Sequence, residues 1–267
     1  MARIKKIIVV ALFLLTLSTP VTAERDRAVD LNLNLGLMRG AFRDEQYSLI
    51  NYELDRGYAI ALGGGYRIDR HHIGVNIEYG HASATTDVYA GWINTYHNAD
   101  LSLSYRYRAL QLFEGRLACD FGLSYAFNFN GIIPSTLDNY AYIGTHNFSP
   151  LIGLQYAINE KHSLYSNFKI AILSLVARPQ FSKFSPDENG VEITNYKTSL
   201  FRELRDVQAC SVNHHINTEL TLGYQYKIGN SFATAIEYRY YFRRYAEVDP
   251  YTSYANEIRV ILRLNLH

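Results

Sequence analysis

The feature that most constrains this chain is an alternation of apolar and polar residues with a period of two. Near the start, Leu31, Leu33, Leu35 and Leu37 alternate with polar or small residues. Successive side chains of a strand point to opposite faces, so this pattern gives one apolar and one polar face. Similar segments recur to the end of the chain. They predict an all-β fold of about ten strands, mostly ~9 to 14 residues long, which is longer than strands of most soluble sheets.

The connections between these expected strands alternate in length. Short connections are expected at 69–71, 108–112, 159–162 and 227–231, and long ones at roughly 43–56, 83–92, 129–146, 177–213 and 244–254. An even number of antiparallel strands, with short turns at one end and long loops at the other, is typical of a barrel that crosses a membrane. We therefore expect a single antiparallel up-and-down barrel.

Aromatic residues agree with this expectation. The chain has 23 Tyr but one Trp, and many tyrosines stand near the ends of the apolar sets, among them Tyr66, Tyr79, Tyr105, Tyr156 and Tyr238. Rings at strand ends, with Leu, Ile and Val between them, match the aromatic girdles that flank a lipid-facing belt.

The opposite face of the expected strands is rich in charge. It would carry Glu78, Asp100, Arg106, Arg116, Asp120, Lys169, Glu219, Glu237, Arg239, Glu257, Arg259 and Arg263. A soluble barrel does not fill an apolar interior with twelve charges, because burying unpaired charge is costly. The apolar face is therefore expected to look outward into lipid, and the charged face to line the lumen.

The first residues have the pattern of a secretory signal peptide. Arg3, Lys5 and Lys6 precede an apolar run at 7–17, and small residues end the segment at Ala23. We expect a signal peptide at 1–23 and one barrel domain at 24–267. The formal net charge of +1 gives no support to a nucleic-acid binder that acts through bulk basicity.

Over residues 24–267 the sequence resembles the bacterial outer-membrane β-barrel class. The resemblance implies a Gram-negative outer-membrane location, short periplasmic turns and long extracellular loops. The last strand, 257–267, is similar to the assembly signal of that class, although it ends in His267 rather than Phe or Trp. It implies the barrel-assembly machinery as a partner, beside outer-membrane lipids.

Two interpretations of the charged lumen stay open. Six acidic and six basic side chains favour mutual pairing, which would plug the barrel. The other interpretation is a narrow channel for ions or small solutes. Barrels of eight strands are filled by side chains and those of sixteen or more are open, so ten strands lie nearer the closed end.

A possible catalytic pair is His81 with Ser83, two residues apart on the lipid-facing side of one strand. Such a pair could act as base and nucleophile toward an ester. It resembles the His-x-Ser arrangement of outer-membrane phospholipases and lipid A deacylases. Those families add an Asn or Glu on the next strand, where this chain has Thr95. A pair of polar rim residues without catalytic function is the alternative that we favour.

The longest loop, 177–213, carries several basic residues and a stretch with helix-like spacing. Arg202 and Arg205 in this loop, with Arg243 and Arg244 at the same rim, could contact lipopolysaccharide phosphates, because Arg binds phosphate in a bidentate manner. The alternative is a solvated loop. The sequence does not identify an extracellular ligand that this loop would bind.

Other candidate groups give weaker signals. The doublets 71–72 and 214–215 place neighbouring His residues on opposite faces of a strand, which does not favour a metal site. We expect no disulfide between Cys119 and Cys210. The sequence thus favours a non-enzymatic barrel without cofactor or metal, with a structural or surface-interaction role through its outer loops, or a porin-like narrow channel. The alternative is an outer-leaflet lipid esterase that uses Ser83 and His81.

Overall fold

A computed structural model describes residues 27–45, 48–88, 94–133, 141–178, 207–229, 231–247 and 250–266. The expected signal peptide at 1–23 lies outside these ranges. The strands are β1 (Arg27–Asp44), β2 (Ser48–Ile68), β3 (His71–Thr85), β4 (Asn94–Leu112), β5 (Leu117–Ile133), β6 (Ala141–Ala157), β7 (His162–Ile170), β8 (Leu173–Ala177), β9 (Gln208–Ser211), β10 (His215–Ile228), β11 (Phe232–Tyr245) and β12 (Tyr251–Leu266). Within the described ranges, helices long and apolar enough to cross a membrane are absent.

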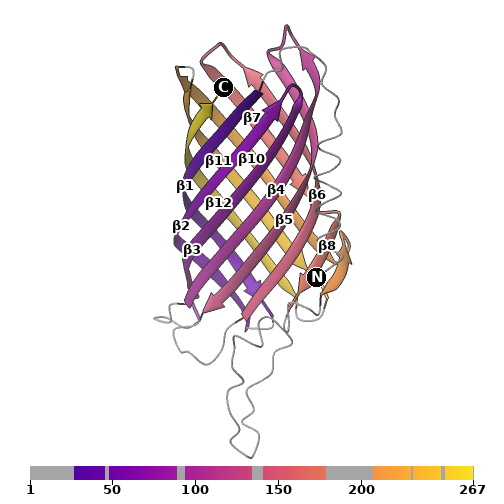
Figure 1. The fold of residues 1–267 in the computed structure, drawn as a ribbon. Coiled ribbons are helices and arrows are strands. Elements are labelled where there is room, and N and C mark those ends of the chain that lie inside the picture. Colours follow the sequence, from indigo (N-terminus) through magenta and orange to yellow (C-terminus); the bar gives the residue numbers. More distant parts are fainter. Residues whose placement is uncertain are drawn as a thin grey trace, which may run out of the picture.

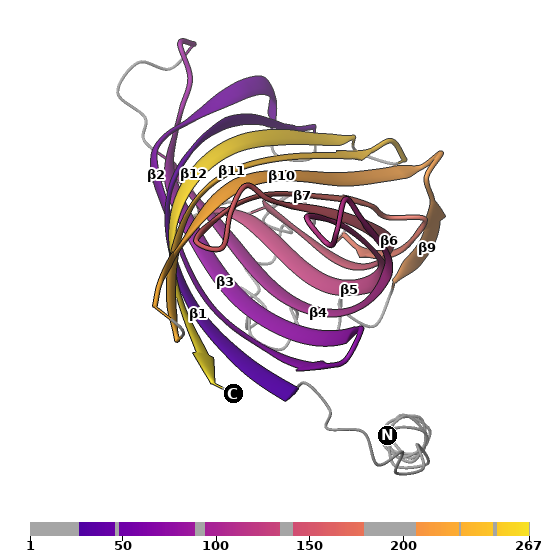
Figure 2. The ribbon, with the colours of Figure 1, turned by 90° about the horizontal axis from the view of Figure 1, so that it is seen from above.

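These strands form a closed antiparallel barrel (Figures 1 and 2). β1 pairs with both β2 and β12, and the pairing of β5 with β6 completes the ring. β8 continues the line of β7 along β6 after a break at 171–172. β9 leads into β10 through the turn at 212–214, so twelve strand segments among the described residues make a ten-strand ring. The expected all-β, ten-strand barrel is therefore confirmed.

The two ends of the barrel differ, as the connection lengths predicted. At the upper end in Figure 1, called the turn end below, the connections are 69–70, 113–116, 158–161 and 229–231. The opposite end, called the loop end, carries the connections 45–47, 86–93, 134–140, 178–207 and 246–250. β1 begins and β12 ends at the turn end, where Val29 pairs with Leu266.

Several predicted connections were wrong in position because the strands are longer than expected. The predicted loop 43–56 is mostly strand, since β1 and β2 pair up to Asp44 and Ser48. The predicted turn 108–112 belongs to β4, and the turn follows it at 113–116. The other predicted loops are also shortened, and β9 takes up part of 177–213. β1 has 18 residues and β2 has 21, more than the roughly 9 to 11 that a bilayer crossing requires.

The central part of the barrel is apolar outside and polar inside. Leu37 is 74% exposed and Ile258 60% exposed, whereas their inward neighbours Gly36 and Glu257 are buried. This band of exposed Leu, Ile, Val and Phe side chains is called the lipid belt below. Tyrosines flank it, with Tyr66, Tyr107 and Tyr156 toward the turn end and Tyr58 and Tyr79 toward the loop end.

Beyond the lipid belt, at the loop end, the polarity is reversed. Arg39 and Arg43 are exposed on the outer face of β1, while Met38 and Phe42 are buried inside. The inward side chains form an apolar core of Met38, Phe42, Tyr52, Leu54, Ala82, Ala84, Tyr96, Ile132, Tyr241 and Ala255. This loop-end core has the pattern of a water-soluble barrel, so the strands continue past the membrane surface.

Candidate functional site

The lumen contains most of the charged residues that the alternation placed there. Ten of the twelve line a cavity of about 810 Å³ inside the barrel: Glu78, Asp100, Arg106, Asp120, Lys169, Glu219, Glu237, Arg239, Arg259 and Arg263. Glu257 is also inward but fully buried among its neighbours. The placement of Arg116 was wrong, because it lies exposed in the turn 113–116, after β4 has ended.

A chain of ion pairs crosses the middle of the lumen. Arg239 of β11 lies 2.8 Å from Glu78 of β3 and 2.8 Å from Glu219 of β10. Arg259 of β12 lies 2.8 Å from Glu78 as well. Lys169 and Glu257 extend the chain, at 2.8 Å from Glu219 and 2.6 Å from Arg259. Because β3 and β11 lie across the ring from each other, these pairs span the lumen, and the cavity continues past them to Asn128, Asn147 and Arg243.

A layer of amides lies next toward the loop end. Asn147 donates to Asn128 at 2.6 Å, and Asn128 donates to Asp100. Arg243 of β11 donates to Asn130 of β5 at 2.5 Å and to Asn98 of β4 at 3.3 Å. The bonds of Arg243 join opposite walls, whereas those among Asn147, Asn128 and Asp100 join neighbouring strands. Strand parity directs these amides inward, but the sequence analysis did not single them out, Asn130 lies in the predicted loop 129–146, and their contacts depend on how the ring closes.

The loop-end core closes the lumen beyond the amide layer. Phe42 stacks on Tyr52 and on Tyr96, with ring centroids 5.1 and 5.6 Å apart. Tyr241 and Ala255 are 1% and 0% exposed. Charge pairs, amides and packed rings therefore occupy successive levels of the described lumen toward the loop end.

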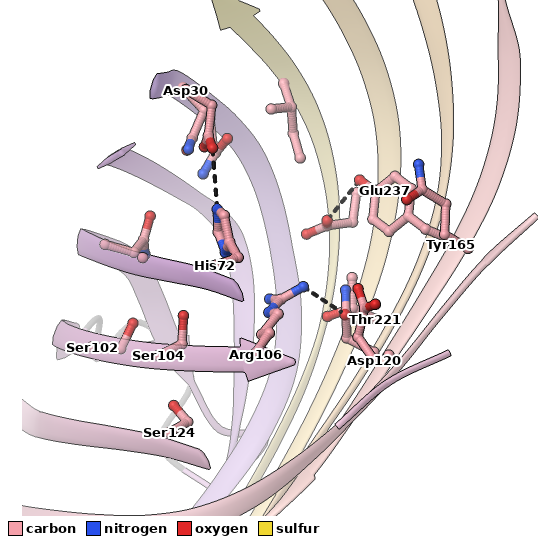
Figure 3. A pocket seen from close by; sticks show the side chains of 18 of the residues that line it. Asp30, His72, Ser102, Ser104, Arg106, Asp120, Ser124, Tyr165, Thr221 and Glu237 are labelled. Carbon is pink, nitrogen blue, oxygen red and sulfur yellow. Dashed lines mark hydrogen bonds and ion pairs between the residues drawn. The ribbon is translucent and has the colours of Figure 1, made fainter. Parts of the chain in front are cut away.

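The cavity opens in the other direction. Residues of the short connections, Asp69, Arg70, Glu160 and Lys161, line its mouth at the turn end. Figure 3 shows the interior of this cavity, with Asp30 and His72 near one wall and Tyr165 and Glu237 near the other. The sequence did not single out Arg67, Arg108 or His72 for this cavity, although the parity of β2, β3 and β4 directs them inward.

The pair His81 and Ser83 lies on the outward face of β3 at the loop-end edge of the lipid belt. The His81 ring stacks on His97 with a centroid distance of 5.2 Å, and it contacts the Tyr58 ring edge at 5.2 Å. Its Nδ1 atom has no hydrogen-bond partner among the described residues. The hydrogen bonds of the described part of the chain include none between His81 and Ser83 or from a carboxylate to His81.

The four arginines expected at the outer rim divide into three cases. Arg202 and Arg205 lie outside the described residues. Arg244 is exposed on the outer face of β11, as expected. Arg243 was wrongly placed: it is 4% exposed and points into the lumen over the Tyr241 ring. Adjacent residues of a strand point to opposite faces, so the two could not share the rim.

Other groups at the loop end are mostly paired. Arg178 and Asp44 form a buried ion pair at 2.5 Å, and Arg178 also contacts the rings of Tyr245 and Tyr251. His214 is exposed and pairs with Glu247. In the described ranges, no three His, Cys, Asp or Glu side chains are arranged to hold a metal ion.

His215, by contrast, is buried at the loop end, level with Tyr245. Burial, together with the nearby charge of Arg243, lowers the pKa of His215 to about 4. The neutral ring is hydrogen-bonded to the Ser174 hydroxyl at 2.8 Å. Cys210 is a buried free thiol whose pKa is raised by burial and by the Glu247 carboxylate, and Cys119 is free on β5.

Comparisons with known proteins identify the fold. No family model and no curated protein sequence matches the chain. Among solved structures, the outer-membrane protease OmpT of Escherichia coli is similar with a TM-score of 0.54 and 9% identity, over 94% of this chain and 100% of that one. The translocator domain of the autotransporter NalP of Neisseria meningitidis has a TM-score of 0.42 and 10% identity, over 97% and 95% of the two chains. The chain therefore has the fold of a bacterial outer-membrane β-barrel, with an apolar belt suited to face lipid.

Proposed function

We propose that this protein is a non-enzymatic outer-membrane barrel whose lumen is closed to solutes, with a structural or surface-interaction role at its loop end. The observation that supports this most strongly is the ion-pair chain from Lys169 through Arg239 and Glu78 to Glu257, which crosses the lumen. An ion passing through would have to move between these buried, paired charges in a narrow lumen, where charge is poorly solvated. The amides and the loop-end core add two further barriers.

The surface next to the lipid belt supports contact with anionic outer-leaflet head groups. On the outer face, Arg43 of β1 and Arg244 of β11 each pair in register with Thr252 of β12. Neighbouring strands are spaced about 4.8 Å apart, so the two arginines, on the two strands that flank β12, are roughly 10 Å apart. Tyr254 is exposed on β12 two residues nearer the belt. Lipopolysaccharide phosphates at this level would meet both guanidinium groups.

Planar-bilayer conductance of the purified, refolded protein tests the closed lumen. We expect no reproducible steps from the full chain, nor from a variant that lacks residues 180–208, while a porin measured in the same membrane conducts. Steps from the full chain would refute the proposal and favour the narrow channel. Steps only from the trimmed chain would also refute it, because the closure would then depend on the long loop.

The lipid-esterase alternative is less well supported by the geometry. Ser83 lies opposite Asp55 and Thr95 on the adjacent strands, and Asp55 pairs with Arg39 at 3.2 Å. His81 therefore has stacked rings rather than an orienting acceptor beside it. Release of fatty acid from outer-leaflet lipid that is lost in Ser83→Ala would favour this alternative. The E. coli barrel is a protease, but a shared fold at 9% identity gives no reason to transfer that activity.

A further inference from the structure

The half of the cavity nearest the turn end contains arginines that outnumber their carboxylate partners. Asp30 is bonded to His72 at 3.1 Å, and Asp120 pairs with Arg108 at 3.0 Å. Glu237 accepts a hydrogen bond from the Tyr165 hydroxyl at 2.9 Å. Besides Arg70 at the mouth, the other arginines that line this half are Arg67, Arg106 and Arg263. In the described part of the chain, none of these three has a carboxylate oxygen within 4 Å of its guanidinium group.

The three guanidinium groups come from β2, β4 and β12 and line the same cavity. Arg67 and Arg106 flank His72 at one level of three neighbouring strands, β2, β3 and β4. Arg106 points into the cavity (Figure 3) and donates to Asn167 of β7 at 3.1 Å. Arg263 of β12 lies over the Tyr165 ring at 5.2 Å and donates to Gln225. Arg263 is close enough to repel both Arg67 and Arg106, while Asp30 and Asp120 attract both without forming an ion pair with either.

Neutral amides satisfy these arginines only in part. Arg106 donates to one amide oxygen, and its Nε atom is buried without a partner among the described residues. Positive charges without a carboxylate in ion-pair contact are costly in a narrow lumen, since mutual repulsion adds to the loss of hydration. An anion placed among them would offset both costs, and guanidinium groups bind carboxylate and phosphate oxygens with charge-assisted hydrogen bonds.

We propose that this cavity is a binding site for a small phosphate- or carboxylate-bearing solute that enters from the turn end, with Arg67, Arg106 and Arg263 as its ligating residues. The volume of about 810 Å³ is within the range of small-molecule sites. The serines Ser102 and Ser104 of β4 line the same cavity and supply hydroxyl groups for a polar ligand. That the solute is bound rather than conducted rests on the proposed closure toward the loop end, whereas the binding site itself does not.

Isothermal titration calorimetry of the refolded full-length barrel, in a non-ionic detergent at fixed chloride concentration, tests this site. The probes are inorganic pyrophosphate, inorganic phosphate and citrate. We expect saturable 1:1 binding of at least one of them. Loss of one charge-assisted contact in Arg106→Gln or Arg263→Gln should weaken it by about tenfold or more. Arg116→Gln removes the same charge from an exposed turn at the same end, outside the cavity, and should leave the affinity unchanged.

Each result bears on the proposal. Absence of saturable heat with all three anions would overturn it, as would an equal loss of affinity in Arg116→Gln, which would indicate general attraction to positive charge. If Arg106→Gln does not fold, Arg67→Gln takes its place, because Arg67 is more exposed in the cavity. Pyrophosphate binding without citrate binding would assign the site to phosphate-bearing solutes, and the reverse would assign it to carboxylates. The outcome is independent of bilayer conductance.

Discussion

Replacement of Arg239 by methionine is the sharpest test of how the lumen is held closed. Its guanidinium group lies 2.8 Å from both Glu78 and Glu219 and 3.7 Å from Glu257. The cluster contains three carboxylates and three cations, the other two cations being Arg259 and Lys169. Arg239→Met keeps most of the side-chain volume but leaves one buried carboxylate without a balancing charge.

The expected loss of unfolding free energy is about 3–5 kcal/mol, the range for breaking a buried ion pair on one side. Equilibrium urea unfolding of the reconstituted barrel, followed by far-UV circular dichroism, measures it. Arg116→Met is the matched control because the exposed Arg116 should change stability by no more than about 0.5 kcal/mol.

A second substitution separates charge imbalance from lost packing. Glu78→Gln in the Arg239→Met background restores a balanced cluster, because it removes the carboxylate that Arg239 contacts across the lumen. We expect the double variant to be more stable than Arg239→Met by about 1–3 kcal/mol. The reasoning is refuted if Arg239→Met costs less than about 1 kcal/mol, or if the two substitutions destabilise additively.

Three further predictions concern other parts of the barrel. In the unfolded chain His215 takes up a proton near its ordinary pKa of about 6.5, but in the folded protein its pKa is about 4. The free energy of unfolding should therefore fall by about 2 kcal/mol from pH 7.5 to pH 5. Urea unfolding should show that His215→Gln removes this pH-dependent component. Arg244→Gln should reduce the lipopolysaccharide retained through purification, measured by phosphate content, whereas Arg116→Gln should not. A Cβ atom at Gly36 would collide with the Glu257 carboxylate, so Gly36→Val should lower the urea midpoint by the equivalent of about 1–3 kcal/mol.

The part of the fold within the lipid belt could be predicted from the sequence. Lipid requires an apolar outer face along every strand, so the period of two is visible in each segment. Strand parity then assigned residues such as Glu78 and Arg239 to the lumen, where the structure places them. Their partners could not be predicted, because Arg239 and Glu78 are 161 residues apart and meet only through ring closure.

The loop-end extension was predicted as loop for a physical reason. The outward residues there face water, so the outer face changes from apolar to polar. On β1, Leu35 and Leu37 are followed by Arg39 and Arg43 on the same face. A search for outward apolar residues ends at Leu37. In β2 the strand also contains a bulge, at Arg56 with a φ of 51°, and a bulge shifts which residues point inward.

The reversal of polarity at the loop end, from an apolar to a polar outer face, also connects the fold to the proposed function. A barrel that continues into water needs an apolar interior, and at the loop end that interior is the packed core around Tyr96 and Tyr241. The residues that make the extension stable therefore also occupy the lumen. A channel through the described barrel would require removing this core as well as parting the ion pairs around Arg239. The proposed closure of the lumen thus follows from the stability of the extension, and the cavity at the turn end is the part of the lumen that remains accessible to a ligand.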